Sequence, residues 1–403
     1  MLVNFKELLC AFSDALDFVE SDLFGLKKDH GKHVAYMAAK MGLHAGLSSD
    51  EISDLMACAL LHDNALCDLS QGNKQEDVNT VLNSPGLAAH CIQGESNISK
   101  MVFYENVKDV VLYHHEWGNG GGPFHKTYQE VPFFSRLIHL ADVIDITFYT
   151  QDLLEQGQRE EAVLDFLQET RNSVFDEETV SLFEKCIEEG IIGELDSVNA
   201  NYLINEVFPN SMRDFDFDDI INIGLMFSTI IDYKSSFTKM HSSGIAQKAL
   251  DMARYYKWDK ETQAKYFLAG SLHDIGKLAI NTAVLEKPGK LTDEEFEHIK
   301  NHAQITWHVL HRIHGFEDIT EWAGNHHERL NGTGYPNGKS GLDLDYESRL
   351  LACIDVYQAL REDRPYRAGM THEKAMRILY EEAAANKLDG QCLGDIDIVM
   401  KET

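Results

Sequence analysis

The sequence has few cysteines, few prolines and few positive charges, and it has no long apolar run. The seven cysteines stand at 10, 58, 67, 91, 186, 353 and 392, without a C-x-x-C pair, which argues against a disulfide framework or a zinc knuckle. Acidic residues interrupt the first twenty positions, where a signal peptide needs an unbroken apolar segment. The best membrane candidate, residues 220–231, contains Asn222 and is shorter than the roughly 20 residues of a span. These absences predict a cytoplasmic protein without a membrane partner.

The charge balance is strongly acidic, with 36 lysines and arginines against 66 aspartates and glutamates and a formal net charge of -30. Such a charge repels a phosphate backbone, so duplex nucleic acid is not an expected partner. A small anionic substrate is compatible with it, because a few cations or metal ions invert the field locally. Apolar residues recur at three- and four-residue spacing, as in 261–280 and 293–313, and alternating patterns are almost absent. We therefore expect an all-α fold.

The two halves of the chain repeat one pattern of histidines and aspartates. The tripeptide His-His-Glu occurs at 114–116 and again at 326–328, each time before a glycine-rich loop. The other pairs are His30 with His241, His62-Asp63 with His273-Asp274, His90 with His302, and Asp142 with Asp355. The offset between partners stays between 211 and 213 residues, which indicates a tandem duplication. A boundary in the acidic stretch 194–219 predicts two domains, 1–205 and 206–403.

The repeated residues are types that bind metal ions. In the second copy they are His241, His273, Asp274, His302, His326, His327 and Asp355. A single histidine on an apolar helix face is usually a packed core residue, but the repetition of the whole set favours a chemical role. Neutral imidazole and carboxylate bind first-row divalent cations, and seven ligands exceed what one ion uses. The pattern predicts two ions bridged by Asp274, whereas unmatched histidines such as His298 and His308 are expected to be solvated or structural.

Three blocks of the second copy resemble the signature of HD-GYP phosphodiesterases. They are HDIGK at 273–277, HHERLNGTGYP at 326–336 and DVYQALREDRPYR at 355–367, in matching order and spacing. The resemblance implies two tandem helical bundles of the HD type and a dinuclear centre of iron or manganese. The implied reaction is hydrolysis of cyclic di-GMP or 3'3'-cGAMP to the linear 5'-phosphorylated dinucleotide, pGpG or pApG.

The resemblance also implies roles for individual residues. His241, His273, Asp274 and Asp355 would hold one ion, and Asp274 would bridge to a second ion held by His302, His326 and His327. The implied catalytic residues are His273, Asp274 and Lys277, and the implied substrate-binding residues are Lys277, Tyr335, Arg364 and Arg367. Glu328 is expected to orient a ligating histidine. Some members bind a third ion through a glutamate four residues before the first histidine, but Phe237 stands there, so we expect two ions.

The first copy keeps all seven equivalent ligands: His30, His62, Asp63, His90, His114, His115 and Asp142. These predict a second dinuclear site. The substrate residues differ, because Leu66 replaces the lysine, Gly122-Pro123-Phe124 replaces Gly-Tyr-Pro, and Gln151 and Leu154 replace the arginines. The first domain is therefore either a 5'-nucleotidase that acts on the linear product or a metal-loaded structural or sensory domain.

Two other functions stay open for the whole chain. One is a receptor that binds a cyclic dinucleotide without cleaving it, and the other is a general nucleotidase or phosphomonoesterase. The complete ligand set and Lys277 favour cleavage, and the Gly-Tyr-Pro loop with the arginine pair argues against a phosphomonoesterase. The residues do not distinguish cyclic di-GMP from 3'3'-cGAMP or iron from manganese, and they predict neither protein partners nor an oligomeric state.

Overall fold

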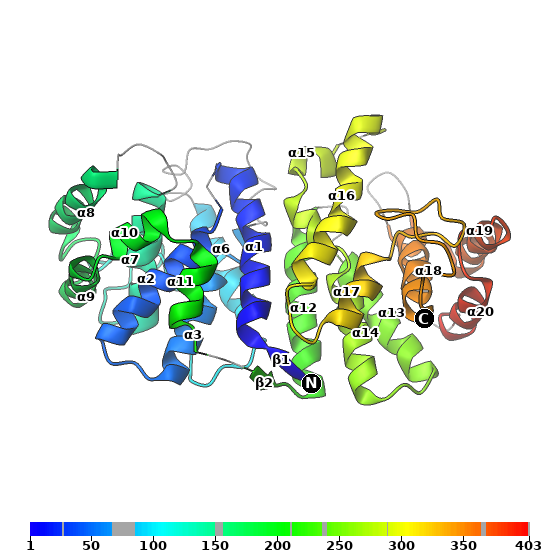
Figure 1. Ribbon diagram of the computed structural model, residues 1–403, viewed down its shortest axis with the longest axis horizontal. Coiled ribbons are helices and arrows are strands. Elements are labelled where there is room, and N and C mark those ends of the chain that lie inside the picture. Colours follow the sequence, from blue (N-terminus) through cyan, green and yellow to red (C-terminus); the bar gives the residue numbers. More distant parts are fainter. Residues whose placement is uncertain are drawn as a thin grey trace. The chain divides into compact units, whose positions relative to one another are not determined.

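The computed structural model describes residues 1–25, 28–66, 85–149, 156–209, 212–235, 240–287, 289–363 and 368–401. Helices make up 65% of the described residues, and the one sheet within these ranges has two strands, which confirms the all-α class. The chain forms two compact units, Phe5–Met212 and a second made of Met1–Asn4 with Arg213–Thr403. In Figure 1 the colours run from blue to green through the first unit and from green to red through residues 213–403 of the second, whose first four residues are blue.

The first unit is a bundle of helices in which α2 packs against α3, α7, α9 and α11. Its described helices are α1 (Phe5–Phe24), α2 (His30–His44), α3 (Ser49–Leu60), α6 (Pro85–Ile98), α7 (Phe133–Phe148), α8 (Gln156–Thr170), α9 (Glu177–Glu188), α10 (Ile191–Ser197) and α11 (Ala200–Val207). A capping box begins α3: Ser48 Oγ accepts from the Glu51 N–H, and the Glu51 carboxylate accepts from the Ser48 N–H. Such a box satisfies two donors for which the helix has no internal partner.

The second unit is built around α13 and α14, which pack against each other and against α12. Its elements are α12 (Phe217–Tyr233), α13 (His241–Tyr255), α14 (Lys260–Leu272), the 3-10 helix η2 (Ile275–Ala279), α15 (Thr282–Leu285), α16 (Asp293–Leu310), α17 (Glu317–Gly324), α18 (Tyr346–Arg361), α19 (His372–Ala384) and α20 (Gly390–Val399). Ala246, Leu250 and Phe267 form a buried core cluster. A Cβ at Gly270 would lie 3.0 Å from the Cα of Ala246, so glycine permits the close approach of α13 and α14.

The order of helices repeats as the sequence pattern does. His30 and His241 open α2 and α13, His62 and His273 follow the ends of α3 and α14, His90 and His302 lie in α6 and α16, and Asp142 and Asp355 lie in α7 and α18. Equivalent helices thus carry equivalent polar residues. The predicted internal duplication of a helical bundle is confirmed.

Residues 1–4 belong to the second unit although they precede the first. Strand β1 (Leu2–Asn4) pairs with β2 (Met212–Asp214), as Figure 1 shows, and the Phe215 N–H donates to the Met1 carbonyl at 3.0 Å. The side chains of Val3 and Phe215 are buried. The predicted boundary at 205/206 places residues 1–4 in the first domain. Strand pairing between segments so distant in sequence leaves no local pattern from which it could be predicted.

The apolar run at 220–231 is explained by packing. It lies within α12, where Ile223, Phe227 and Ile230 are buried. Across the described ranges, no helix combines the length and the apolar character needed to cross a membrane.

Gly276 determines how closely η2 approaches α16. A Cβ at this position would collide with the carbonyl oxygen of His302 and would lie 2.9 Å from the Thr306 nitrogen. Thr306 Oγ1 joins the same elements, since it accepts from the Gly276 N–H at 3.0 Å and donates to the His273 carbonyl at 2.9 Å. In the first unit the equivalent of Gly276 is Ala65, and the equivalent of Thr306 is Gly94. The two copies therefore place their glycine on opposite sides of the same contact.

Replacing Gly276 by alanine is expected to destabilise the second unit by about 1–3 kcal/mol, because backbone atoms block the added methyl group. Urea unfolding of the full chain, followed by circular dichroism, measures the change. Ala65→Gly in the first unit is the matched control, and it is expected to change the free energy of unfolding by about 1 kcal/mol or less. Equal stability of Gly276→Ala and the unmodified chain would contradict the prediction.

Candidate metal centres

In the second unit the seven predicted ligands converge on one cluster. Helix ends carry His241, His273 and Asp274, helices α16 and α18 carry His302 and Asp355, and His326 and His327 follow α17. Six of the seven are buried, and His327 is half-buried. The segments that carry them are far apart in sequence, so the cluster exists only in the folded unit.

Backbone carbonyls orient three of the imidazole rings. Nδ1 of His273, His302 and His326 lies 2.6 to 2.8 Å from the carbonyl oxygen three residues earlier. Because a carbonyl oxygen only accepts hydrogen bonds, Nδ1 carries the proton and Nε2 presents its lone pair to the cluster. The fold thus holds these rings in the tautomer that a metal ligand requires.

The carboxylate of Asp274 faces both sides of the cluster. Oδ1 lies 3.3 Å from Nε2 of His302 and 3.8 Å from Nε2 of His326. Oδ2 lies 3.1 Å from Nε2 of His273 and 3.6 Å from Nε2 of His241. One oxygen for each pair of imidazoles is the arrangement that a carboxylate bridging two ions needs.

The remaining contacts complete two sets of donor atoms. Asp355 Oδ1 lies 3.3 Å from Nε2 of His241, and Asp355 Oδ2 lies 3.5 Å from Nδ1 of His327. Two groups are His241 with His273 and Asp355, and His302 with His326 and His327, and the donor atoms within each group lie within 4.8 Å of one another. A further group of the same closeness, His273 with Asp274 and His326, connects the two. The grouping matches the predicted assignment of ligands to two ions, which stays a prediction.

Burial and neighbouring charges determine the protonation of the rings. Burial lowers the pKa of His302 to about 4, and burial with the neighbouring His273 and His302 lowers the pKa of His326 to about 3. Both rings are therefore neutral at pH 7 and able to coordinate. Burial also acts to lower the pKa of His241, but the carboxylates of Asp355 and Glu362 outweigh it and raise that pKa to about 10. His241 must consequently release a proton when a metal ion binds.

The first unit contains the same arrangement around Asp63. Asp63 Oδ1 lies 3.0 Å from Nε2 of His90 and 3.7 Å from Nε2 of His114, and Oδ2 lies 3.6 Å from Nε2 of His62. Asp142 completes the cluster: its Oδ1 lies 3.4 Å from Nε2 of His30, and its Oδ2 lies 3.6 Å from Nδ1 of His115. All seven predicted residues of the first unit therefore meet.

The donor atoms fit divalent metal ions. Several are buried and have no hydrogen-bond partner among the described residues: Nε2 of His273 and Oδ1 of Asp274 in the second unit, and Nε2 of His30 and His62, Oδ1 of Asp63 and both oxygens of Asp142 in the first. Each such group costs about 1–3 kcal/mol or more if it stays unsatisfied. Imidazole nitrogen and carboxylate oxygen suit first-row divalent cations, so metal ions would satisfy these atoms in both units.

Lys277 lies in the second cluster. Its Nζ donates to Oδ2 of Asp274 at 2.5 Å, from one turn of η2 beyond that aspartate. Leu66, in the corresponding place of the first unit, is buried and apolar. An ammonium group beside the candidate bridge is therefore a difference between the two clusters.

The Gly-Tyr-Pro loop covers one side of the second cluster. The Tyr335 ring centroid lies 4.7 Å from that of His327, and the Tyr335 N–H donates to the His327 carbonyl at 3.2 Å. A Cβ at Gly334 would lie 2.5 Å from the Cα of Glu328, so this position requires glycine. The prediction for Glu328 was wrong: its oxygens accept from the N–H groups of Asn337 and Lys339, at 2.7 and 2.9 Å. Through these two hydrogen bonds Glu328 orients the loop backbone.

Several sequence predictions fall outside the described residues. Arg364 and Arg367, Phe237, and the first-copy residues Gln151 and Leu154 are among them. The two arginines stay predicted substrate-binding residues.

The sequence reasoning missed a buried glutamate beside the first cluster. Glu20, on α1, is 2% exposed, and its Oε2 has no hydrogen-bond partner among the described residues. Burial raises the pKa of Glu20 to about 8, although the nearby His30 opposes the rise. Asp232, in the corresponding part of α12, accepts instead from the Ser242 N–H at 2.9 Å. No sequence motif marks Glu20, because it lies on α1, a helix that carries none of the repeated cluster residues.

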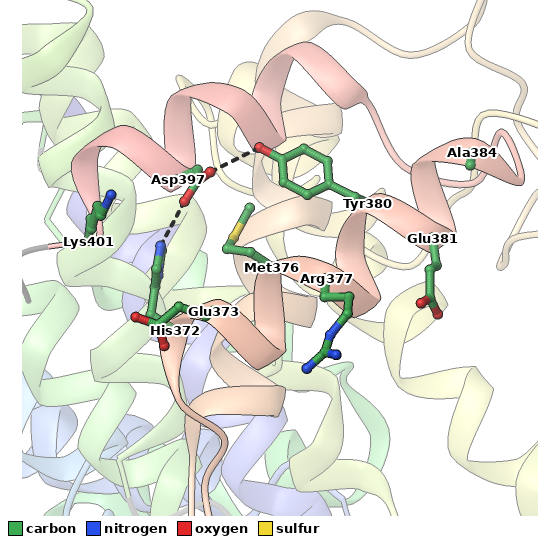
Figure 2. Close-up of a pocket in the computed structure, with 9 residues that line it drawn as sticks. All are labelled: His372, Glu373, Met376, Arg377, Tyr380, Glu381, Ala384, Asp397 and Lys401. Carbon is green, nitrogen blue, oxygen red and sulfur yellow. Dashed lines mark hydrogen bonds and ion pairs between the residues drawn. The ribbon is translucent and has the colours of Figure 1, made fainter.

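A shallow groove of about 610 Å³ lies between α19 and α20 (Figure 2). It is lined by His372, Glu373, Met376, Arg377, Tyr380, Glu381, Ala384, Asp397 and Lys401, none of them a predicted site residue. Figure 2 shows His372 and Tyr380 directed at Asp397, with hydrogen bonds of 2.8 and 3.2 Å. Because these polar groups satisfy one another, the clusters are the stronger candidates for a functional site.

Comparisons with known proteins place both units in one family. Models of the HD domain match residues 28–147 and 225–392. The chain is 29% identical to 3'3'-cGAMP-specific phosphodiesterase 1 of Vibrio cholerae, over 100% of this chain and 92% of that protein. It is 27% identical to 3'3'-cGAMP-specific phosphodiesterase 3 of the same organism, over 96% and 92%. A cyclic di-GMP phosphodiesterase of Pseudomonas aeruginosa is 31% identical over 46% of this chain and 44% of its own length.

A solved structure has the same fold. The crystal structure of a cyclic GMP-AMP-specific phosphodiesterase of V. cholerae, V-cGAP3, aligns with a TM-score of 0.67 and 24% identity, over 100% of this chain and 99% of that one. Family matches in both halves agree with the duplicated fold and the two clusters. The chain belongs to the HD-domain family and carries two HD domains in tandem, the second with the HD-GYP signature.

Proposed function

We propose that the second unit hydrolyses a cyclic dinucleotide, preferentially 3'3'-cGAMP, to the linear 5'-phosphorylated product pApG. The observation that carries the proposal is a two-set ligand cluster in a chain that is similar over both units to two 3'3'-cGAMP-specific phosphodiesterases. The cyclic di-GMP phosphodiesterase of P. aeruginosa matches under half of the chain. Similarity across both units favours 3'3'-cGAMP over cyclic di-GMP.

The residues of the second unit have separate roles in this proposal. Two bound divalent cations would supply water activation and charge stabilisation for in-line displacement at phosphorus. Asp274 and Asp355 would hold these ions, with imidazoles whose orientation the backbone already determines. Lys277 would move from Asp274 to a phosphate oxygen of the substrate, and the Tyr335 ring would stack on a base.

The arginines that follow α18 would bind the substrate phosphates. Arg364 and Arg367 are three residues apart, and a guanidinium group makes bidentate contacts with phosphate. Their proposed role rests on the sequence motif. Iron or manganese would suit the ligand set of this unit.

We further propose that the first unit removes the 5'-phosphate from the linear product. The complete cluster around Asp63, with unpartnered donor atoms, supports a second metal-dependent site. Leu66 in place of the lysine supports a different substrate from that of the second unit. A phosphomonoester bound end-on requires fewer contacts than a cyclic diester that is held at two phosphates.

Product analysis tests both proposals. Purified protein loaded with manganese or iron(II) is incubated with 3'3'-cGAMP and, separately, with cyclic di-GMP, and nucleotides and free phosphate are measured over time. We expect pApG to appear first and phosphate to follow. Asp63→Asn is expected to abolish the phosphate and to preserve pApG. Binding of both substrates without cleavage by the loaded protein would instead indicate a receptor, and phosphate release unaffected by Asp63→Asn would contradict the role of the first unit.

Replacing Lys277 by alanine is expected to lower the turnover of 3'3'-cGAMP by about 10²-fold or more, the usual effect of losing one group that stabilises transition-state charge. Metal content, measured by elemental analysis, should not fall, since the lysine is no ligand. Lys374→Ala, at an exposed lysine of α19, is the control and should retain full activity. Loss of metal from Lys277→Ala, or full turnover, would contradict the role proposed for the ammonium group.

A further inference from the structure

The first histidine of each cluster is held by a carboxylate at its Nδ1. In the first unit, Nδ1 of His30 lies 2.7 Å from Oδ2 of Asp145. In the second unit, Nδ1 of His241 lies 3.0 and 3.2 Å from the two oxygens of Glu362. The other ring nitrogen, Nε2, faces the cluster in both units. Each carboxylate therefore directs the ligating nitrogen inward.

Asp145 and Glu362 do not correspond in the duplication. Asp145 follows the cluster residue Asp142 by three positions on α7, and the residue three positions after Asp355 on α18 is Gln358. Glu362 lies four residues beyond Gln358, immediately after Arg361, the last residue of α18. The supporting carboxylate thus occupies a different helical turn in each copy.

Gln358 connects the two positions. Its Nε2 donates to Oε1 of Glu362 at 2.5 Å, and its side chain is 7% exposed. The Gln358 amide stands where the first unit has the Asp145 carboxylate. This amide holds the Glu362 carboxylate, which faces His241. Glu362 is consequently restrained on two sides, by the ring and by the amide.

A third position differs in concert with these two. In the first unit, Nδ1 of His33 lies 2.9 Å from Oδ1 of Asp145, so this carboxylate supports two histidines. The counterpart of His33 is Gly244, where a Cβ would collide with Nε2 of Gln358 and lie 2.9 Å from its Cδ. Glycine is required for Gln358 to lie in this place. Three exchanges that depend on one another indicate a rebuilt support for the histidine.

We propose that Glu362, held by Gln358 above Gly244, is the positioning residue that fixes His241 for metal binding in the second unit, as Asp145 fixes His30 in the first. This inference rests on the proposed metal centre of the second unit. Backbone carbonyls orient His273, His302 and His326, whereas a side chain orients His241. Substitution of Glu362 should therefore affect the affinity for metal, and the loss of such an outer partner typically weakens metal binding about 10- to 100-fold.

A manganese titration of the full chain tests the proposal without substrate. Free Mn(II) is measured by electron paramagnetic resonance in an Asp63→Asn background, in which the first cluster lacks its central carboxylate. Glu362→Ala is expected to raise the Kd of the second unit for Mn(II) about 10- to 100-fold. The double variant Glu362→Ala with Gln358→Asp restores a carboxylate at the position equivalent to Asp145. Its Kd for Mn(II) should be lower than that of Glu362→Ala by about tenfold or more. Glu373→Ala, at an exposed glutamate of α19, is the control.

Thermal unfolding of each metal-free variant, and the isosteric Glu362→Gln, separate positioning from folding. An unchanged Kd in Glu362→Ala overturns the proposal, and so does a weakened Kd that Gln358→Asp fails to restore in a folded chain. If the unmodified chain cleaves no cyclic dinucleotide while the titrations come out as expected, the proposed function fails and the positioning role stands. If cleavage is found while the Kd does not change, the positioning role fails and the proposed function stands.

Discussion

Asp274→Asn should lose at least about 10³-fold of the turnover of 3'3'-cGAMP, whereas Asp63→Asn should keep it. The Asp274 carboxylate lies between two pairs of imidazoles, 3.1 Å from His273 and 3.3 Å from His302. An amide at this position supplies one weaker oxygen ligand and no negative charge, so it would hold two divalent ions less well than the carboxylate would. Metal ions stabilise the transition state by several kcal/mol, and each about 1.4 kcal/mol corresponds to a factor of ten in rate.

Initial rates of pApG formation at saturating substrate measure this effect, and the metal content of each variant shows whether an ion is lost. Asp63→Asn is the matched control, because it makes the same chemical change at the equivalent position of the other unit. Activity of Asp274→Asn within about tenfold of the unmodified chain would contradict the second cluster as the active site. A loss in Asp63→Asn and none in Asp274→Asn would assign the cleavage to the first unit.

Removal of metal ions is expected to lower the melting temperature of both units by roughly 10 °C. An ion present at about a thousand times its Kd stabilises the folded state by about 4 kcal/mol. A unit of this size shifts by about 2–4 °C for each kcal/mol. The physical cause is the set of buried ligand atoms that have no hydrogen-bond partner among the described residues, such as the carboxylate oxygens of Asp142 in the first unit and Nε2 of His273 in the second. Without an ion, the folded chain leaves these groups unsatisfied.

Calorimetry of chelator-treated protein, before and after addition of Mn(II), measures the shift. Asp63→Asn should remove most of the metal-dependent shift in melting temperature of the first unit, and Asp274→Asn should remove most of that of the second. The two variants therefore show which melting transition belongs to which unit. Identical melting curves with and without metal would mean that the clusters are packed polar cores. Such a result would also remove the basis for the first-unit phosphatase activity.

The sequence by itself determined the class of fold, the duplication and the residues that form both clusters. The reason is that these depend on patterns that repeat along the chain: helical spacing of apolar residues, and histidines and aspartates at one offset. The duplication served as an internal control, because a histidine that recurs at the same place is rarely only a core residue. The motif around Lys277 then distinguished the two copies.

The tertiary structure alone decided which side chains support the clusters. Glu20 reaches the first cluster from α1, Glu328 binds loop backbone instead of a histidine, and Glu362 replaces Asp145 from a different helical turn. These contacts depend on side-chain length and direction between segments that are distant in the chain. A carboxylate can support the same histidine from several positions in the chain, so its sequence position does not show which histidine it contacts. The cluster residues have few geometric alternatives, so their spacing in the sequence is enough to predict them.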